Sequence, residues 1–320
     1  MHPIERDDYV LPTVAIERFV NVCLSWIRSN VVGALVPGLQ RIGKTYAIAY
    51  FVANCQRWLK GAVGVVSVEV GFHKNITEAL FFGDLLRSMK RPTTKSRPED
   101  RRNLFVGYLV EAAARSTAKK VVIFIDEAQI LDEHLFKLLI SVHNELWKVY
   151  EIKAVWILVG QPELEAFVTT FVAQGKRQIV GRFMTDTHHF EPLSGIENFE
   201  AALSCYDEYL RHPAEGPTFT ECYGPDAYAA GYRLRQDAKL LYSRIEIARD
   251  AAGLPSSVGM TMQGFTTLMN HIIVNVLPTL KPGDRLTAEL IDEAIETTNC
   301  MIYEQQEAII AAPVPVDDGE

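Results

Sequence analysis

Residues 38–45 read G-L-Q-R-I-G-K-T and fit the phosphate-binding pattern G-x-x-x-x-G-K-T. The loop follows the apolar run of residues 31–36 and precedes residues 46–56, which contain no Gly or Pro. Strand, glycine loop and helix is the arrangement in which backbone N–H groups at a helix N-terminus cradle phosphate oxygens. The motif therefore predicts a nucleotide site in an α/β fold. Its residues are Gly38, Leu39, Gln40, Arg41, Ile42, Gly43, Lys44 and Thr45.

Within this loop, two side chains have distinct expected roles. Lys44 is expected to reach the β- and γ-phosphates of ATP, and the Thr45 hydroxyl is expected to bind Mg²⁺.

Apolar runs alternate with helical segments through the first 190 or so residues. Residues 64–70, 121–125 and 154–159 resemble buried strands, and residues 133–149 place leucines and a valine on one helix face. This alternation predicts a parallel sheet covered by helices on both faces. Strand-like runs stop near residue 195. We expect an extension over residues 1–30, a nucleotide-binding domain over 31–195, a helical lid domain over 196–310 and a disordered tail over 311–320.

Charge is distributed unevenly along a chain whose formal net charge is −8. Residues 1–120 hold 18 Lys and Arg against 10 Asp and Glu, whereas the remainder holds 14 against 30. This asymmetry indicates a polyanion-facing region in an acidic protein.

The five cysteines are scattered, which favours neither a zinc site nor a disulfide scaffold. With no signal-peptide pattern and no membrane-length apolar run, we expect a cytoplasmic protein without a membrane partner.

Polar residues follow two of the predicted strands. Asp126 and Glu127 come directly after residues 121–125. A carboxylate there suits Mg²⁺, so Asp126 is assigned to the metal with Thr45, and Glu127 is the candidate general base. Gln161 follows residues 154–159 and is the candidate γ-phosphate sensor, the alternative being an ordinary turn set by Pro162.

Two basic segments offer further candidates. Arg177 and Arg182 lie just before the expected domain boundary, where an arginine from a neighbouring molecule is able to assist phosphoryl transfer. Residues 87–102 form the most basic window, which the prolines predict to be a flexible loop. Two interpretations of its cations remain open, a solvated surface loop and a contact with the phosphate backbone of a nucleic acid. These cations are Arg87, Lys90, Arg91, Lys95, Arg97, Arg101 and Arg102. The pair at 188–189, two histidines, lacks the partners of a metal site.

Together these motifs resemble those of AAA+ ATPases. The segments that carry the resemblance are residues 38–45, 121–129, 158–164 and 176–193. The last two are similar to one branch, which contains the transposition regulators TnsC, TniB and MuB and the ExeA-type secretion ATPases. The resemblance implies a parallel αβα sandwich with a helical lid, and rings or filaments with ATP and Mg²⁺ between subunits. It also implies that Arg182, with Arg177 as fallback, acts in trans and that Gln161 is the first sensor.

The same resemblance implies a role on double-stranded DNA. Regulators of this type assemble on the target with ATP, recruit a transposase and disassemble on hydrolysis, and the basic window would contact the DNA backbone. Two alternatives are an ExeA-like ATPase in envelope assembly and a nucleotide-gated scaffold with little turnover. The scaffold gains support because residues 259–270 contain no Arg or Lys to serve as the second sensor of the lid.

Overall fold

Two compact units make up the chain, for which a computed structural model describes residues 1–254 and 259–311. The sheet unit consists of Arg18–Leu39 and Lys44–Phe190. The helical unit consists of Met1–Glu17, Gln40–Gly43 and Glu191–Glu320. The domain bounds expected at residues 31 and 195 stay a prediction, and the expected tail lies, after Ala311, outside the described residues.

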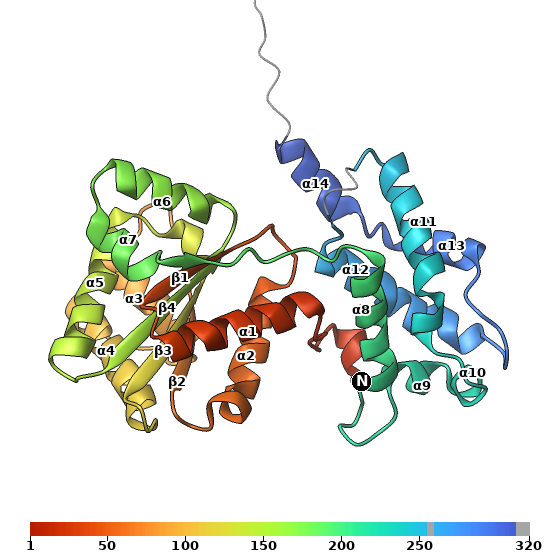
Figure 1. The fold of residues 1–320 in the computed structure, drawn as a ribbon, viewed down its shortest axis with the longest axis horizontal. Helices are drawn as coiled ribbons and strands as arrows, with labels where there is room; N and C mark the ends of the chain where they lie inside the picture. The colour runs from red at the N-terminus through yellow and green to blue at the C-terminus, as the bar shows by residue number, and fades with distance from the viewer. Residues whose placement is uncertain (255–258, 312–320) are drawn as a thin grey trace, which may run out of the picture. The chain divides into compact units, whose positions relative to one another are not determined.

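A parallel sheet of five strands, in the order β2-β3-β4-β1-β5, forms the centre of the sheet unit (Figure 1). The strands are β1 (Gly33–Pro37), β2 (Gly64–Glu69), β3 (Lys120–Asp126), β4 (Lys153–Gly160) and β5 (Asp186–Thr187). This sheet with its flanking helices is the predicted αβα fold, which is confirmed. The first four strands match the apolar runs, whereas β5 has two residues and is too short for any periodic signal.

Each face of the sheet is covered by helices, because side chains of successive strand residues point to opposite faces. On one face, Phe124 of β3 packs between Phe19 and Phe51, with ring centroids 5.9 and 5.1 Å apart. The alternate residues Ile123 and Ile125 join the core on the other face. Figure 1 shows helices on both sides of the strands. The helices are α1 (Val14–Ser29) and α2 (Lys44–Leu59) on the first face, and α3 (Glu78–Ser88), α4 (Pro98–Ala114), α5 (Glu133–Lys148), α6 (Glu163–Ala173) and α7 (Arg177–Phe183) on the second.

The basic window is not one flexible loop, which corrects the prediction for residues 87–102. Arg87 lies in the last turn of α3, and α4 begins at Pro98, so residues 89–97 alone connect the two helices. Proline is favoured at the first position of a helix, and the acidic Glu99 and Asp100 stabilise the first turn through the helix dipole. Arg101 and Arg102 are therefore helical residues.

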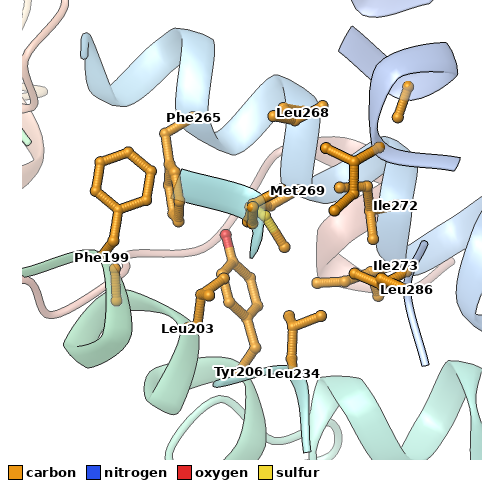
Figure 2. Close-up of a cluster of buried hydrophobic side chains, with 14 of the residues drawn as sticks. Phe199, Leu203, Tyr206, Leu234, Phe265, Leu268, Met269, Ile272, Ile273 and Leu286 are labelled. Atoms are coloured by element: carbon orange, nitrogen blue, oxygen red, sulfur yellow. The ribbon is translucent and has the colours of Figure 1, made fainter. Parts of the chain in front are cut away.

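The helical unit encloses a separate hydrophobic core, part of which is drawn in Figure 2. Tyr206 is fully buried there, and its hydroxyl lies 2.8 Å from that of Tyr9, which donates to Asn270 Oδ1 at 2.8 Å. The unit contains η1 (Pro3–Arg6), α8 (Ile196–Glu208), α9 (Phe219–Tyr223), α10 (Pro225–Ala229), η3 (Leu234–Asp237), α11 (Ala238–Ala251), α12 (Met262–His271), the π-helical turn η4 (Ile272–Val276), η5 (Leu277–Thr279), α13 (Ala288–Thr298) and α14 (Ile302–Ala311).

Two local features of this unit were not anticipated. The N-terminal segment contributes Ile4 and Leu11 to the core of the helical unit. The short helix α9 begins with a reciprocal cap. In that cap Thr218 Oγ1 accepts from the Glu221 N–H at 3.2 Å, and the Glu221 carboxylate accepts from the Thr218 N–H at 3.4 Å. Among the described residues, no helix is both long enough and apolar enough to cross a bilayer.

Replacing Phe124 tests the packing of the first sheet face. We expect Phe124→Ala to lower the free energy of unfolding by about 3–5 kcal/mol, because a fully buried ring between two helices leaves a cavity. Phe72, which is 83% exposed, provides the matched control, and Phe72→Ala should change stability by less than about 0.5 kcal/mol. Denaturant unfolding measures both, and equal costs would contradict the assignment of Phe124 to the core.

Candidate functional site

The phosphate loop joins the end of β1 to the start of α2. Its first residue is tied to the sheet, because the Gly38 N–H donates to the Gly160 carbonyl of β4 at 3.1 Å. Gly43 has φ of 101°, a left-handed conformation that side chains disfavour, so glycine is required there. The Lys44 ammonium donates to the carbonyl oxygens of Gly38, at 2.7 Å, and of Leu39. The loop thus holds its lysine within its own curve, where the phosphates of a nucleotide would lie.

The Thr45 hydroxyl meets the carboxylate of Asp126 at the carboxyl edge of the sheet. Thr45 Oγ1 donates to Asp126 Oδ2 at 2.6 Å, which joins the phosphate loop to the end of β3. Burial raises the pKa of Asp126, although the Thr45 hydroxyl and the Glu127 N–H act in the opposite direction. A hydroxyl and a carboxylate are hard oxygen ligands of the kind that Mg²⁺ prefers, so this pair fits the predicted metal site.

Another carboxylate, that of Glu69, belongs to the strand next to Asp126, and the sequence analysis did not assign it to the site. Glu69 ends β2 and is paired in register with Asp126. Burial first, and then the charges of Asp126 and Glu127, raise the pKa of Glu69. Carboxylates thus lie close enough at this edge to repel one another, and a divalent cation bound there would offset the repulsion. The only sequence signal for Glu69 was its place at the end of a predicted strand.

Glu127 is held by its backbone and by a neighbouring amide. Its φ of 55° is left-handed, and its N–H donates to Asp126 Oδ1 at 3.0 Å. Gln129, in the short helix η2 (Ala128–Ile130), donates from Nε2 to Glu127 Oε2 at 2.6 Å. Eight other described non-glycine residues share a positive φ, so the feature that singles out Glu127 is the contact of its carboxylate with Gln129.

The same amide reaches the tip of β4. Gln129 Oε1 accepts from the Gln161 N–H at 3.1 Å, so Gln161 and Glu127 contact opposite ends of one side chain. Because β4 lies between β1 and β3, its tip lies between the phosphate loop and Asp126. The structure thus brings Lys44, Thr45, Asp126, Glu127 and Gln161 to one edge of the sheet.

The two candidate arginines lie elsewhere, on α7. Arg182 donates to the Gln178 carbonyl at 3.3 Å and to Asn144 Oδ1 of α5 at 3.5 Å, whereas Arg177 is exposed. The backbone of Arg182 packs on Gly33, where a Cβ would lie 2.2 Å from the Arg182 carbonyl oxygen. Gly33 begins β1, and the phosphate loop follows the other end of that strand. Arg182 is therefore remote from the phosphate loop of its own subunit.

Four of the seven cations proposed for DNA contact have partners within the sheet unit. Arg87 pairs with Asp84 at 2.6 Å, and the Arg91 guanidinium lies 5.1 Å from the centroid of the Tyr108 ring. Arg101 donates to the Ala79 and Lys95 carbonyls, each at 2.6 Å, and Arg102 pairs with Glu145 at 2.6 Å. Lys90, Lys95 and Arg97 are exposed and form no ion pair with any described residue.

Residues Gln40–Gly43 belong by their contacts to the helical unit. Within that unit, the Gln263 N–H donates to the Arg41 carbonyl at 3.2 Å, and the Arg41 guanidinium lies 4.1 Å from the centroid of the Tyr303 ring. These partners were not predicted, because they come from α12 and α14, more than 200 residues away in sequence.

The described residues contain no cluster of three His, Cys, Asp or Glu side chains with the arrangement of a metal site. The second residue of the histidine pair, His189, lies 2.7 Å from Glu165 through Nε2 and Oε1.

Comparison with known proteins places these observations in a family context. Residues 33–168 match a family model described as an AAA domain. No curated protein sequence matches the chain. The ORC2 protein of Aeropyrum pernix, in its ADPNP-ADP complexes, superposes with a TM-score of 0.54 at 15% identity, over 98% of this chain and 75% of that protein. A Walker-type ATPase of Pyrococcus abyssi gives 0.51 at 13% identity, over 95% and 77%.

At these identities the superpositions establish the fold. The matched residues 33–168 include the phosphate loop, Asp126, Glu127 and Gln161, which the structure gathers at one edge of a parallel sheet. Residues 33–168 are therefore similar to an AAA domain, and the chain has the P-loop αβα fold of AAA+ ATPases.

Proposed function

We propose that this protein is an ATP-hydrolysing, oligomeric AAA+ regulator of DNA transposition, which assembles on target DNA and recruits a transposase. The observation that carries the ATPase part is the 2.6 Å contact between Thr45 and Asp126, beside Lys44 and Glu127. Phosphoryl transfer from ATP to water requires such a set of groups: a lysine in the phosphate loop, a hydroxyl and a buried carboxylate for the metal, and an adjacent glutamate.

Each of these residues has a defined task in the proposed reaction. Thr45 and Asp126 would hold Mg²⁺, which neutralises charge on the phosphates when bound. Lys44 exchanges its carbonyl partners for phosphate oxygens, and Gln161 orients the terminal phosphate or the water. Glu127 accepts a hydrogen bond from the attacking water and takes its proton as the water oxygen bonds to the γ-phosphorus. The bond between that phosphorus and the β–γ bridging oxygen breaks in the same step, and ADP and phosphate are released.

Arg182 is proposed to complete the site of a neighbouring subunit. Its backbone lies against the first residue of β1, so it is remote from its own phosphate loop, and its half-buried side chain contacts Asn144 of α5. An arginine supplied in trans makes hydrolysis dependent on assembly. Arg177, exposed in the first turn of the same helix, is the fallback.

DNA contact is proposed for the connection between α3 and α4. Lys90, Lys95 and Arg97 are exposed cations there, whereas Arg101 and Arg102 are engaged in holding α4. Exposed cations of this kind supply sequence-independent affinity for phosphates. The transposition role rests on the resemblance of residues 158–164 and 176–193 to the TnsC, TniB and MuB branch. Electron microscopy with duplex DNA and a non-hydrolysable ATP analogue tests the assembly, and we expect rings or filaments on the DNA. If no such assembly forms, this proposal is refuted.

Replacement of the proposed base separates binding from chemistry. Glu127→Gln should retain ATP and lower turnover by about two to four orders of magnitude, because the amide cannot accept the proton. Lys44→Ala serves as the comparison and should weaken ATP binding itself. Phosphate release and a fluorescent ATP analogue measure the two effects. Near-normal turnover in Glu127→Gln would remove Glu127 as the base, and negligible turnover of the unmodified protein on DNA would favour a nucleotide-gated scaffold.

Mixing two inactive variants tests the arginine in trans. Glu127→Gln subunits retain Arg182, and Arg182→Ala subunits retain Glu127. An equimolar mixture should recover about a quarter of the unmodified activity, because one in about four interfaces then combines both intact groups. Mixtures with Arg177→Ala in place of Arg182→Ala identify the fallback. If no mixture exceeds its separate components, the trans role of α7 is excluded.

Charge removal at the α3–α4 connection tests the DNA contact. Neutralising Lys90, Lys95 and Arg97 to Gln should weaken duplex binding and reduce the slope of log K against log salt by about 2–3. The control is a variant in which three other lysines of the sheet unit are changed to Gln together, namely Lys60, Lys119 and Lys153. It removes the same charge elsewhere on this unit and should leave the slope unchanged. Fluorescence anisotropy across a salt series measures it, and equal slopes for both triple variants would clear this connection of DNA contact.

A further inference from the structure

The side chain of Gln129 bridges two functional segments that are separate in sequence. Its amide nitrogen donates to the Glu127 carboxylate at 2.6 Å, and its amide oxygen accepts from the Gln161 N–H at 3.1 Å. One partner is a carboxylate, which only accepts, and the other is a backbone N–H, which only donates. A single amide orientation satisfies both, so the two contacts support each other.

Gly160 provides the space that this bridge occupies. A Cβ at position 160 would lie 2.3 Å from Gln129 Oε1, well inside van der Waals contact. The next nearest atoms, the Leu164 Cδ1 and the Gln129 backbone nitrogen, would lie at 3.0 and 3.2 Å, where a small shift suffices. A methyl group at 160 would therefore displace the Gln129 amide, which is the free end of a flexible side chain, while the strand persists.

From this geometry we propose that Gln129 is a positioning residue for ATP hydrolysis, which fixes the Glu127 carboxylate and couples it to the tip of β4. The inference rests on the proposed ATPase function and deepens it. Binding one carboxylate oxygen leaves the other available to the attacking water, and it restricts rotation about the Glu127 side chain. Because Gln161 is the γ-phosphate sensor of the proposed mechanism, any movement of the β4 tip reaches Glu127 through a single side chain.

Four variants of the full-length protein, assayed with duplex DNA and Mg-ATP, test the bridge. Gln129→Ala should lower kcat about 10–100-fold and leave the ATP dissociation constant within about twofold, since it removes a contact to the base and none to the nucleotide. Gln129→Glu retains the acceptor for the Gln161 N–H but places a carboxylate beside Glu127, and it should lower kcat at least as far. Gln56→Ala, which removes an exposed glutamine from α2, is the matched control and should behave as the unmodified protein.

The decisive measurement is the coupling between positions 160 and 129. Gly160→Ala should lower kcat about as much as Gln129→Ala does, and the double variant should fall no further, because the methyl group then meets no amide. If the fold-losses in kcat of the two single variants multiply in the double variant, Gly160 acts independently of Gln129 and the proposal is overturned. An unchanged kcat in Gln129→Ala also overturns it, as does a loss confined to ATP affinity or to the thermal unfolding midpoint.

Failure of the inference is distinguishable from failure of the proposed function. If the unmodified protein binds ATP but does not hydrolyse it, with or without DNA, the ATPase proposal and the bridge fall together. If the unmodified protein hydrolyses ATP and Gln129→Ala does so equally well, only the bridge is overturned.

Discussion

The parallel pairing of β1, β4 and β3 is the constraint on which the rest of the site depends. Parallel strands present their carboxyl ends at one edge, so the segments that follow Pro37, Gly160 and Asp126 meet although they are far apart in sequence. The Gly38 N–H bond to Gly160 and the Thr45 bond to Asp126 close this edge. A shift of β4 by one residue would turn its buried side chains to the opposite face and move Gln161 away from Gln129.

Several features of this edge are unfavourable for stability, and a bound cation would offset the electrostatic part of that cost. Burial and the charge of neighbouring carboxylates raise the pKa of Asp126 and that of Glu69, and the backbone of Glu127 is left-handed. The Lys44 ammonium is satisfied by carbonyl oxygens of its own loop. Mg²⁺ would offset the negative charge of the carboxylates, and the phosphates would offer Lys44 stronger partners. Proteins commonly accept such local cost at functional positions, where the surrounding packing supplies the compensation.

Much of the sheet unit was predictable because its signals are local. The glycine loop, the apolar runs of β1 to β4 and the acidic pair at 126–127 each lie within a few residues of sequence. The sequence was less informative where partners come from afar. The cations of residues 87–102 appeared equivalent, yet Arg101 and Arg102 hold helix α4 through Ala79 and Glu145. Proline at 98 was interpreted as a loop residue, whereas it begins that helix.

By itself, the sequence determined the parallel αβα fold, and it predicted the phosphate loop and the set of Lys44, Thr45, Asp126 and Glu127, because these depend on short-range patterns. Only the tertiary structure decided that Gln129 bridges Glu127 and Gln161, that Glu69 adds charge beside Asp126, and that residues 1–17 pack with the helical unit. Apart from the local contact of Gln129 with Glu127, these contacts join distant residues, such as Gln129 and Gln161, 32 residues apart, and Tyr9 and Asn270, 261 apart. They depend on which strands become neighbours, and no local pattern records that choice.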